Sequence, residues 1–409
     1  MSMYPSSAVE QAMTRHEIIL RAMSGELSWI QAATILGMHA RTLRRWRSRW
    51  EKDGYDGLLD RRTQRPSPKR APVQELERIL QLYREQYVGF NVRHFHELAV
   101  AEHHVELSYS FVKKALQQAG LVAKAKGRGR HRKRRERRER FGQMLHIDGS
   151  FHPWVELAEE PRCCLIVVLD DATSEILHAR FWPQETTEAI LTALHEVVSQ
   201  WGIPQSLYSD RASWAFRTPQ AGGPVAADAL TAVGAVLDRL GVEHIPSYCP
   251  QGRGRSERMN GTLQGRLVHE LRAAGVATLE AANHYLEQQY LPRHNQRFSQ
   301  APSSADSAFV AVDPIDVEMA FAAAHTRTVA RDNTVQIHTQ VLQLDPQRGR
   351  ASCAGLKVVV RCHRSGHYTI WKDWRLLGCY DPRGHPVPPE MVFGGALASG
   401  YALRSRTAA

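Results

Sequence analysis

The sequence predicts a multidomain protein with all-α helix-turn-helix modules at its N-terminal side, an α/β core and a small C-terminal β barrel. Helical periodicity dominates residues 1–123, strands and helices mix in residues 141–305, and strand-like alternation dominates residues 329–383. At 409 residues the chain is too long for a single small core, which favours several domains.

Residues 1–56 are predicted to form a first helix-turn-helix DNA-binding domain. Thr14 and Ser28 can each cap a helix, and Gly37 can end the second helix with a tight turn. The third helix, HARTLRRWRSRWEKDG, is apolar on one side and rich in arginine elsewhere, as a helix in a DNA major groove requires. Its apolar stripe is Leu43, Trp46 and Trp50. Its candidate DNA-binding residues are Arg41, Arg44, Arg45, Arg47 and Arg49.

A second helix-turn-helix domain is predicted for residues 72–123, after a polar, proline-rich linker at 57–71. Its third helix, SYSFVKKALQQAGL, has a cap near Ser108 and a stop at Gly120. A plain helical spacer is the alternative interpretation. The candidate DNA-binding residues of this domain are Lys113 and Lys114.

Residues 124–140 are predicted to be a basic DNA-binding linker. Eleven Lys and Arg stand against two Glu there, so this segment carries most of the net charge of +11. Such a block attracts nucleic acid, because each neutralised phosphate releases counterions. A solvated linker without a partner is the alternative. The candidates for DNA binding are Arg128, Arg130, Arg132, Lys133, Arg134 and Arg135.

The core, residues 141–305, is predicted to be a mixed sheet flanked by helices, because three strands are followed by alternating helices and strands. The predicted strands lie at 142–151, 162–174, 175–184, 205–210 and 242–248. The predicted helices lie at 186–202, 228–241, 254–274 and 278–291.

The C-terminal part is predicted to contain an alanine-rich helical connector at 306–328, a β barrel at 329–383 and a flexible tail at 384–409. The six cysteines form no CxxC pair, so zinc sites of the finger type are not supported. No apolar run approaches the roughly 20 residues needed to span a bilayer. We therefore expect a soluble, cytoplasmic protein associated with the nucleoid.

Three acidic residues are the candidate catalytic and metal-binding groups. Asp148 lies in the first strand of the core, Asp210 closes the fourth, and Glu257 opens the helix after the fifth. A charge in a buried strand is costly unless it is paired or binds a metal. Three carboxylates from separate elements can converge on hard divalent cations. Two Mg²⁺ or Mn²⁺ ions held in this way could support phosphoryl transfer.

The motifs around these acids resemble those of the DDE transposase and retroviral-integrase catalytic core, which has a ribonuclease H-like fold. HIDGSF is similar to the strand that carries the first aspartate. SDRASWAF is similar to the turn that carries the second, with Arg211 and Ala212 where Asn and Gly are usual. Pro250, Gly252 and Asn260 surround Glu257 as in the third motif of the family.

Two departures from the family pattern concern spacing and DNA contact. The gap between Asp210 and Glu257 is 46 residues, which is long for the integrase group, and residues 217–229 are the candidate insertion. Gln264 stands where the family often has a basic residue, and Arg258 or Arg266 could replace it. The candidate DNA-binding residues in this helix are Arg258, Asn260 and Gln264.

The resemblance implies an insertion-sequence transposase that binds transposon-end DNA, cleaves it by metal-dependent hydrolysis to free 3′-hydroxyls and joins these to target DNA. It also implies a homo-oligomer, a dimer or larger, assembled on double-stranded DNA. The alternatives are a DNA-binding regulator with an inactive core and a ribonuclease H-like nuclease without joining activity. Survival of all three acids argues against the first, and paired DNA-reading modules argue against the second.

Several polar residues near the site have two possible roles. Asp170 and Asp171 could be metal ligands, but turn residues at a strand end are the favoured interpretation. His146 is interpreted as a structural histidine that shares a face with Asp148. In YLPRHNQRF a phosphate contact and a capped helix end remain equally open; the residues concerned are Arg293, Asn295 and Arg297.

Overall fold

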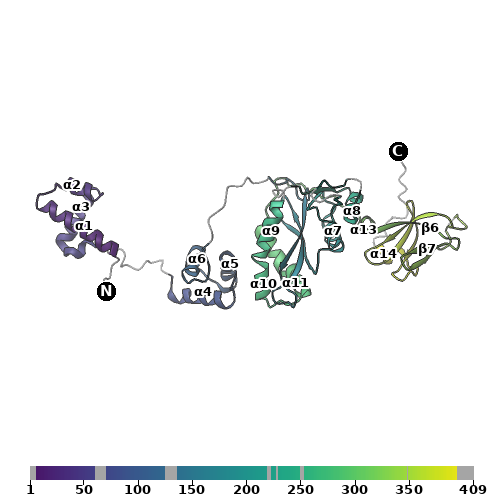
Figure 1. Cartoon of the computed structure of the whole chain (residues 1–409), viewed down its shortest axis with the longest axis horizontal. Helices are drawn as coiled ribbons and strands as arrows, with labels where there is room; N and C mark the ends of the chain where they lie inside the picture. The colour runs from purple at the N-terminus through teal and green to yellow at the C-terminus, as the bar shows by residue number, and fades with distance from the viewer. Residues whose placement is uncertain are drawn as a thin grey trace. The chain divides into compact units, whose positions relative to one another are not determined.

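The computed structural model describes residues 6–59, 71–124, 136–218, 223–226, 229–248, 253–347 and 349–393 (Figure 1). Most of the basic segment 124–140 is outside these residues. The DNA-binding candidates that lie outside the described residues are Arg128, Arg130, Arg132, Lys133, Arg134 and Arg135. The chain divides into two compact units between Ile79 and Leu80.

The first unit contains the predicted three-helix module, with α1 (Ser6–Met23), α2 (Trp29–Ile35) and α3 (Ala40–Asp53). Ser28 caps α2 in a reciprocal capping box with Gln31. Leu43 is fully buried, and Trp46 and Trp50 pack against the same cluster. The prediction for Thr14 is wrong: α1 already begins upstream, and the Thr14 hydroxyl donates to the Glu10 carbonyl within the helix, at 3.0 Å.

The second module consists of α4 (Val73–Glu85), α5 (Val92–His103) and α6 (Tyr109–Gln118). Ser108 caps α6 by accepting a hydrogen bond from the Phe111 amide, and Gly120 follows the helix with a positive φ of 70°. Both predicted signals for this helix are therefore confirmed.

The core is built on a five-stranded mixed sheet in the order β3-β2-β1-β4-β5. Strands β1 (Leu145–Pro153), β2 (Arg162–Asp170) and β3 (Ile176–Trp182) are antiparallel neighbours. Strands β4 (Ser206–Ser209) and β5 (Glu243–Pro246) run parallel to β1 and extend the sheet on its other side. The predicted mixed sheet is therefore present, with β1 at its centre.

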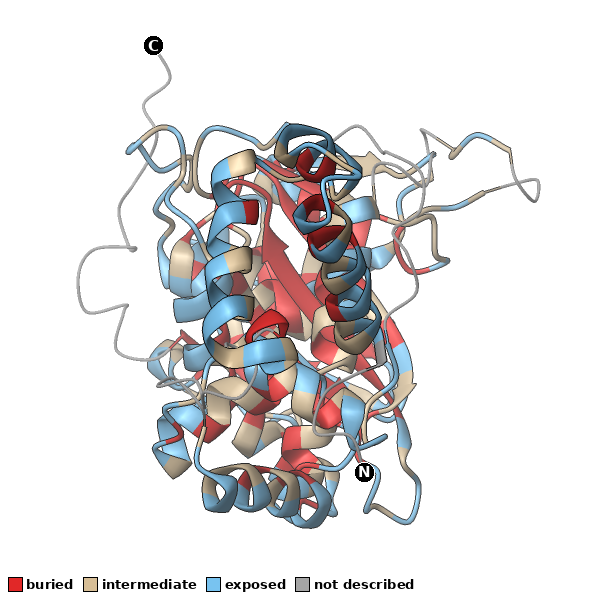
Figure 2. Cartoon of the chain, turned by 90° about the vertical axis from the view of Figure 1, so that its left-hand side faces the viewer, coloured by how far each residue is buried: buried red, intermediate tan, exposed pale blue. Residues whose placement is uncertain are grey.

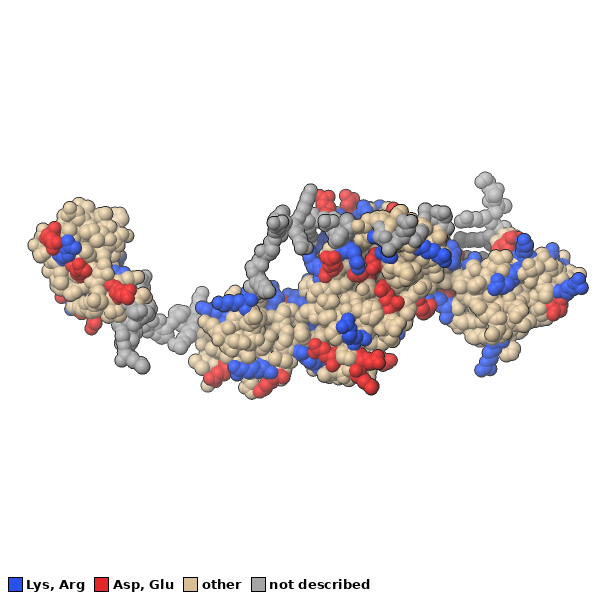
Figure 3. Space-filling model, in the orientation of Figure 1, with Lys and Arg blue, Asp and Glu red and all other residues tan. Residues whose placement is uncertain are grey.

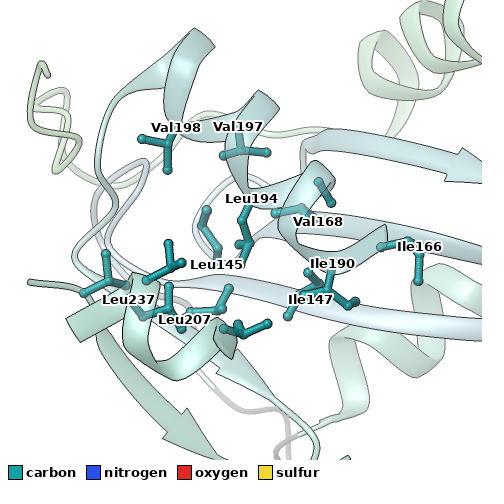
Figure 4. Close-up of a cluster of buried hydrophobic side chains, with 14 of the residues drawn as sticks. Leu145, Ile147, Ile166, Val168, Ile190, Leu194, Val197, Val198, Leu207 and Leu237 are labelled. Carbon is teal, nitrogen blue, oxygen red and sulfur yellow. The ribbon is translucent and has the colours of Figure 1, made fainter. Parts of the chain in front are cut away.

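Helices cover both faces of the sheet. Successive residues of β2 lie on opposite faces, and they belong alternately to two different hydrophobic clusters. Figure 4 shows one cluster, in which Leu145 and Ile147 of β1 meet side chains of α7 (Thr187–Trp201) and α8 (Ala232–Leu240). The opposite face packs against α9 (Gly254–Gln264), α10 (Leu267–Ala273) and α11 (Leu279–Tyr285). Figure 2 shows the buried strands and the exposed outer sides of the helices.

Two predicted helices are divided differently in the structure. The helix predicted at 254–274 is two helices, since α9 ends at a Gly265 cap and Arg266 leaves helical geometry with a φ of −131°. The helix predicted at 278–291 is α11, which continues through the π-helical turn η4 (Leu286–Tyr290) into α12 (Leu291–Phe298).

The C-terminal part differs from its prediction in three places. Only Pro314–Phe321 of the connector is helical (α13), because residues 323–328 pair with β9 as strand β6. The described strands form an antiparallel sheet β11-β10-β9-β6 and a separate hairpin β7-β8, so the predicted closed barrel is not confirmed. Within the tail, Pro389–Phe393 forms α14 and buries Val392 and Phe393, whereas residues 394–409 lie outside the described part.

The strands of this part are β6 (Ala323–Thr328), β7 (Thr334–Ile337), β8 (Gln340–Gln343), β9 (Lys357–Cys362), β10 (Tyr368–Lys372) and β11 (Arg375–Tyr380). Among the described residues, no helix is long and apolar enough to cross a membrane.

Candidate active site

The register of the sheet brings the two candidate aspartates together. Strand β1 pairs with β4 in parallel, with His146 opposite Tyr208. Two residues further along each chain stand Asp148 and Asp210, at neighbouring positions on adjacent strands. Asp148 is buried, with 7% of its surface exposed, whereas Asp210 is half-buried at the end of β4.

One arginine contacts both aspartates. The Nη2 atom of Arg253 lies 2.7 Å from Oδ1 of Asp148 and 3.8 Å from Oδ2 of Asp210. Arg253 is the residue that precedes α9, and the sequence analysis did not single it out. The two carboxylates therefore already converge on a cationic group that belongs to the chain itself.

The electrostatic setting of this pair follows from burial and from the arginine. Burial raises the pKa of Asp148, the Arg253 guanidinium opposes that rise, and the neighbouring Asp210 adds to it. Burial would lower the pKa of Arg253, but the Asp148 and Asp210 carboxylates raise it above its ordinary value. The site therefore favours the charged state of the arginine and attracts positive charge.

Two residues of α9 that were predicted to contact DNA instead contact β1. The Asn260 side chain donates from Nδ2 to Oδ2 of Asp148 at 2.9 Å, and Gln264 donates from Nε2 to the Ser150 hydroxyl at 3.3 Å. The remaining amide oxygen of Asn260, Oδ1, is buried and has no hydrogen-bond partner among the described residues. A DNA contact by either residue remains a prediction, and each now has an observed role in fixing α9 on β1.

Glu257 lies in the first turn of α9 and is exposed. In the described residues, no group of three or more His, Cys, Asp or Glu side chains lies close enough to hold a metal ion. The charge of Glu257 nevertheless contributes to the raised pKa of Arg253, so Glu257 belongs to the same electrostatic cluster. The structure thus brings Asp148 and Asp210 together and leaves Glu257 apart from them.

A buried ion-pair network ties the start of α9 to the sheet. Nε of Arg255 lies 2.6 Å from Oδ1 of Asp171, which is fully buried and also bonded to His146 at 2.8 Å. Burial alone would raise the pKa of Asp171, yet the His146 hydrogen bond and the Arg255 charge hold it well below its usual range. These contacts agree with a structural His146, and Asp170 likewise accepts turn hydrogen bonds from Gly142 and Thr173.

A fourth carboxylate lies near the two aspartates and was missed by the sequence analysis. Glu185, just before α7, accepts a hydrogen bond at Oε1 from the Trp214 indole at 2.9 Å. A Cβ added to Gly149 would lie only 2.7 Å from this carboxylate, so the glycine after Asp148 makes room for it. Burial, with the charges of Asp210 and Asp148, raises the pKa of Glu185. Gly149 was therefore the sequence signal that could have indicated a side chain packed closely against β1 at this position.

The predicted arginines of the first module are available at its surface. Arg47 is half-buried and pairs with Glu51 at 2.6 Å. The exposed candidates on α3 are Arg41, Arg44, Arg45 and Arg49. In the second module, Lys114 is exposed and Lys113 is half-buried over the Tyr109 ring.

Polar residues of α12 contact protein groups rather than standing free. Arg293 pairs with Glu270 at 2.6 Å, and Arg297 pairs with Glu97. The Asn295 amide bonds both backbone groups of Ile176, with Oδ1 accepting at 3.0 Å and Nδ2 donating at 2.9 Å. Arg258 of α9 is exposed, whereas the Arg266 side chain is largely buried and pairs with Glu97 at 2.8 Å.

The helix-turn-helix prediction for the N-terminal side is confirmed by comparison with known families. Residues 14–67 match a helix-turn-helix domain, and residues 42–116 match a homeodomain-like domain. The matched ranges together span both modules of the fold.

Two relatives share most of the length of this chain. It is 27% identical over 370 residues to a putative transposase, y4bF, of Sinorhizobium fredii, covering 90% of this chain and 80% of the relative. It is 26% identical over 321 residues to the transposase for insertion sequence IS1202 of Streptococcus pneumoniae, covering 70% and 68% respectively. The resemblance to insertion-sequence transposases is thereby confirmed.

Solved structures of viral integrases are also matched. The catalytic core of HTLV-2 integrase, in complex with magnesium, is 16% identical and covers 37% of this chain and 88% of that one, with a TM-score of 0.27. A simian T-cell lymphotropic virus intasome in complex with the PP2A regulatory subunit B56 gamma is 13% identical, covers 76% and 99%, and has a TM-score of 0.30. TM-scores this low do not establish a shared fold. The fold of this chain is defined by its own strand order.

Proposed function

We propose that this protein is a DDE transposase, a metal-dependent polynucleotidyl transferase that cleaves transposon-end DNA and joins it to target DNA. The observation that carries the proposal is the convergence of Asp148 and Asp210, from adjacent strands, on one cationic group. The similarity to two transposases over most of the chain and the two helix-turn-helix modules support it. Double-stranded DNA is the substrate in both steps, and the working form is a homo-oligomer on paired ends.

The donor set at the site fits a hard divalent cation. Asp148 and Asp210 offer carboxylate oxygens, and Asn260 offers a buried amide oxygen that has no hydrogen-bond partner in the described part of the chain. Mg²⁺ or Mn²⁺, as two ions held by Asp148, Asp210 and Glu257, would activate the attacking oxygen and stabilise the leaving one. Glu257, in the first turn of α9, completes this set only if its side chain turns toward the two aspartates.

The reaction comprises two displacements at phosphorus. In the first, a water oxygen bonds to phosphorus at the transposon end and the bond to the 3′ oxygen breaks, leaving a 3′-hydroxyl and a 5′-phosphate. In the second, that 3′ oxygen attacks a target phosphodiester, and the displaced target strand keeps a 3′-hydroxyl. The residues of the site position the strands and balance charge, and no covalent protein intermediate is formed.

The test is cleavage of DNA taken from the two flanks of the protein's own gene, with Mg²⁺ or Mn²⁺ present. We expect Asp148→Asn, Asp210→Asn and Glu257→Gln each to lower cleavage by roughly a hundredfold or more, with end binding nearly unchanged. Glu243→Gln, at an exposed acid on β5, is the matched control and should cleave normally. Normal cleavage by one of the three variants would remove that residue from the proposed set.

The outcome with the wild-type protein separates the alternatives. Binding of its own ends without any cleavage would indicate a DNA-binding regulator with an inactive core. Cleavage that never proceeds to joined products would indicate a nuclease.

A further inference from the structure

We propose that Arg253 is a built-in counter-ion that competes with divalent metal for Asp148 and Asp210, so that metal binding requires its displacement. This inference rests on the proposed function, since it takes the two aspartates as metal ligands. It begins from the position of the guanidinium, which approaches both carboxylates with one nitrogen. That position, between oxygens of both acids, is where a shared cation would reduce their mutual repulsion.

Both oxygens of Asp148 already have hydrogen-bond donors. Oδ1 accepts from Arg253 at 2.7 Å and Oδ2 accepts from Asn260 at 2.9 Å. Each carboxylate oxygen has a second acceptor site, so these hydrogen bonds do not by themselves exclude a metal ion; the charge and the position of the Arg253 guanidinium between the two acids would oppose it. Of the two donors to Asp148, only the Arg253 guanidinium has the same charge sign as a metal ion and would repel it, because the Asn260 amide is neutral.

Arg253 can leave without disrupting the core. About 35% of its side-chain surface is exposed, and it precedes α9 instead of lying inside the helix. The α9 start itself is held by the separate Arg255–Asp171 pair. Displacement would then move one side chain and leave the helix anchored.

The inference is tested by titrating the DNA-free, full-length protein with Mn²⁺ and following free Mn²⁺ by electron paramagnetic resonance. We expect Arg253→Ala and Arg253→Gln to bind Mn²⁺ at least roughly threefold more tightly than the wild type, since one competing charge is gone. Arg253→Lys keeps the charge and should remain near the wild type. Arg217→Ala removes an equal charge from an exposed arginine that follows Asp210, and it should also match the wild type.

Each remaining outcome has a distinct meaning. If Asp148→Asn abolishes binding but neither Arg253→Ala nor Arg253→Gln tightens it, the competition is overturned and the proposed metal site stands. Weaker binding by Arg253→Ala, with an unchanged circular dichroism spectrum, would also overturn it, because the arginine would then be organising the acids. If neither the wild type nor any variant binds Mn²⁺, the inference and the proposed function fail together.

Discussion

The two helix-turn-helix modules use the same motif in different ways. In the first, the basic helix α3 leaves its arginines at the surface, and Arg44 and Arg45 are exposed without an ion pair among the described residues. In the second, helix α5 and its N-cap direct polar residues onto the core that contains the five-stranded sheet. Its contacts are Asn91 with the Gly265 carbonyl, His94 with Glu270, and Glu97 with Arg266 and Arg297. A polar helix face is therefore not by itself a DNA-binding face.

The position of these contacts gives the second module a structural link to the site. Asn91 donates to the carbonyl of Gly265, the residue that ends α9, at 3.0 Å. His94 and Glu270 are both buried, and the second oxygen of Glu270 accepts from Tyr285 and Arg293. These buried contacts join α5 to the core within one compact unit, which begins at Leu80 and so includes α5, α6 and the second half of α4.

The largest expected effect comes from breaking that link. Glu270→Ala should destabilise the second unit by about 3 kcal/mol, because it leaves His94 and Arg293 without their shared carboxylate in a buried site. Chemical unfolding of the full chain, followed by tryptophan fluorescence, measures this loss. Glu287→Ala, at an exposed acid nearby in the chain, is the control and should stay within about 0.5 kcal/mol. Equal stability of the two variants would show that the contacts of Glu270 with His94 and Arg293 contribute nothing to the free energy of unfolding.

The same carboxylate predicts a pH dependence for the stability of the second unit. Burial alone would raise the pKa of Glu270, but the His94 and Tyr285 hydrogen bonds and the Arg293 charge hold it below its ordinary value of 4.5. A depressed folded-state pKa stabilises the protein above the unfolded pKa, and that contribution is lost as the pH falls through the folded value. The stability difference between wild type and Glu270→Ala should therefore shrink below about pH 4.5. A stability difference that stays unchanged as the pH falls well below 4.5 would contradict the assignment.

A smaller effect should distinguish the exposed arginines of the first module from a paired arginine of the core in DNA binding. Replacing both Arg44 and Arg45 by Ala should weaken binding about tenfold and lower the salt slope by about 2, one for each lost phosphate contact. Arg297→Ala removes an arginine that is already paired with Glu97, so its salt slope should match the wild type. Titrations at several salt concentrations measure both slopes. An unchanged slope in the double variant would remove α3 from the DNA interface.

Periodicity and capping signals predicted most of the helices and strands, because local sequence determines them. They did not predict the break after α9, where Gly265 caps the helix and Arg266, outside helical geometry, pairs with Glu97 of a distant helix. Nor could alternation distinguish a closed barrel from the observed sheet and hairpin, since closure depends on which strand edges pair. Contacts between segments far apart in the chain are the common element in these differences.

Contacts between distant segments also limited the prediction of the candidate site. Asp148 and Asp210 could be placed together because strand register relates them. The role of Arg253 depends on where one side chain lies between two strands, and the motif gives no sign of it. The charge excess of the chain also lies largely in residues outside the described part, and Figure 3 shows Lys and Arg interspersed with Asp and Glu over the surface in view.

The smallest expected effect is a loss of stability in the first module alone, caused by removing the cap of α2. Ser28 and Gln31 form a reciprocal capping box at the start of α2, with the Ser28 amide donating to Gln31 at 2.9 Å. Ser28→Ala should therefore cost about 1 kcal/mol in the first unit and leave the second unit unchanged, since no α2 residue belongs to it. Hydrogen exchange of the full chain can follow amides of α3 and of β2 separately. Matching losses of protection in both would show that the two units unfold together, against the division between Ile79 and Leu80.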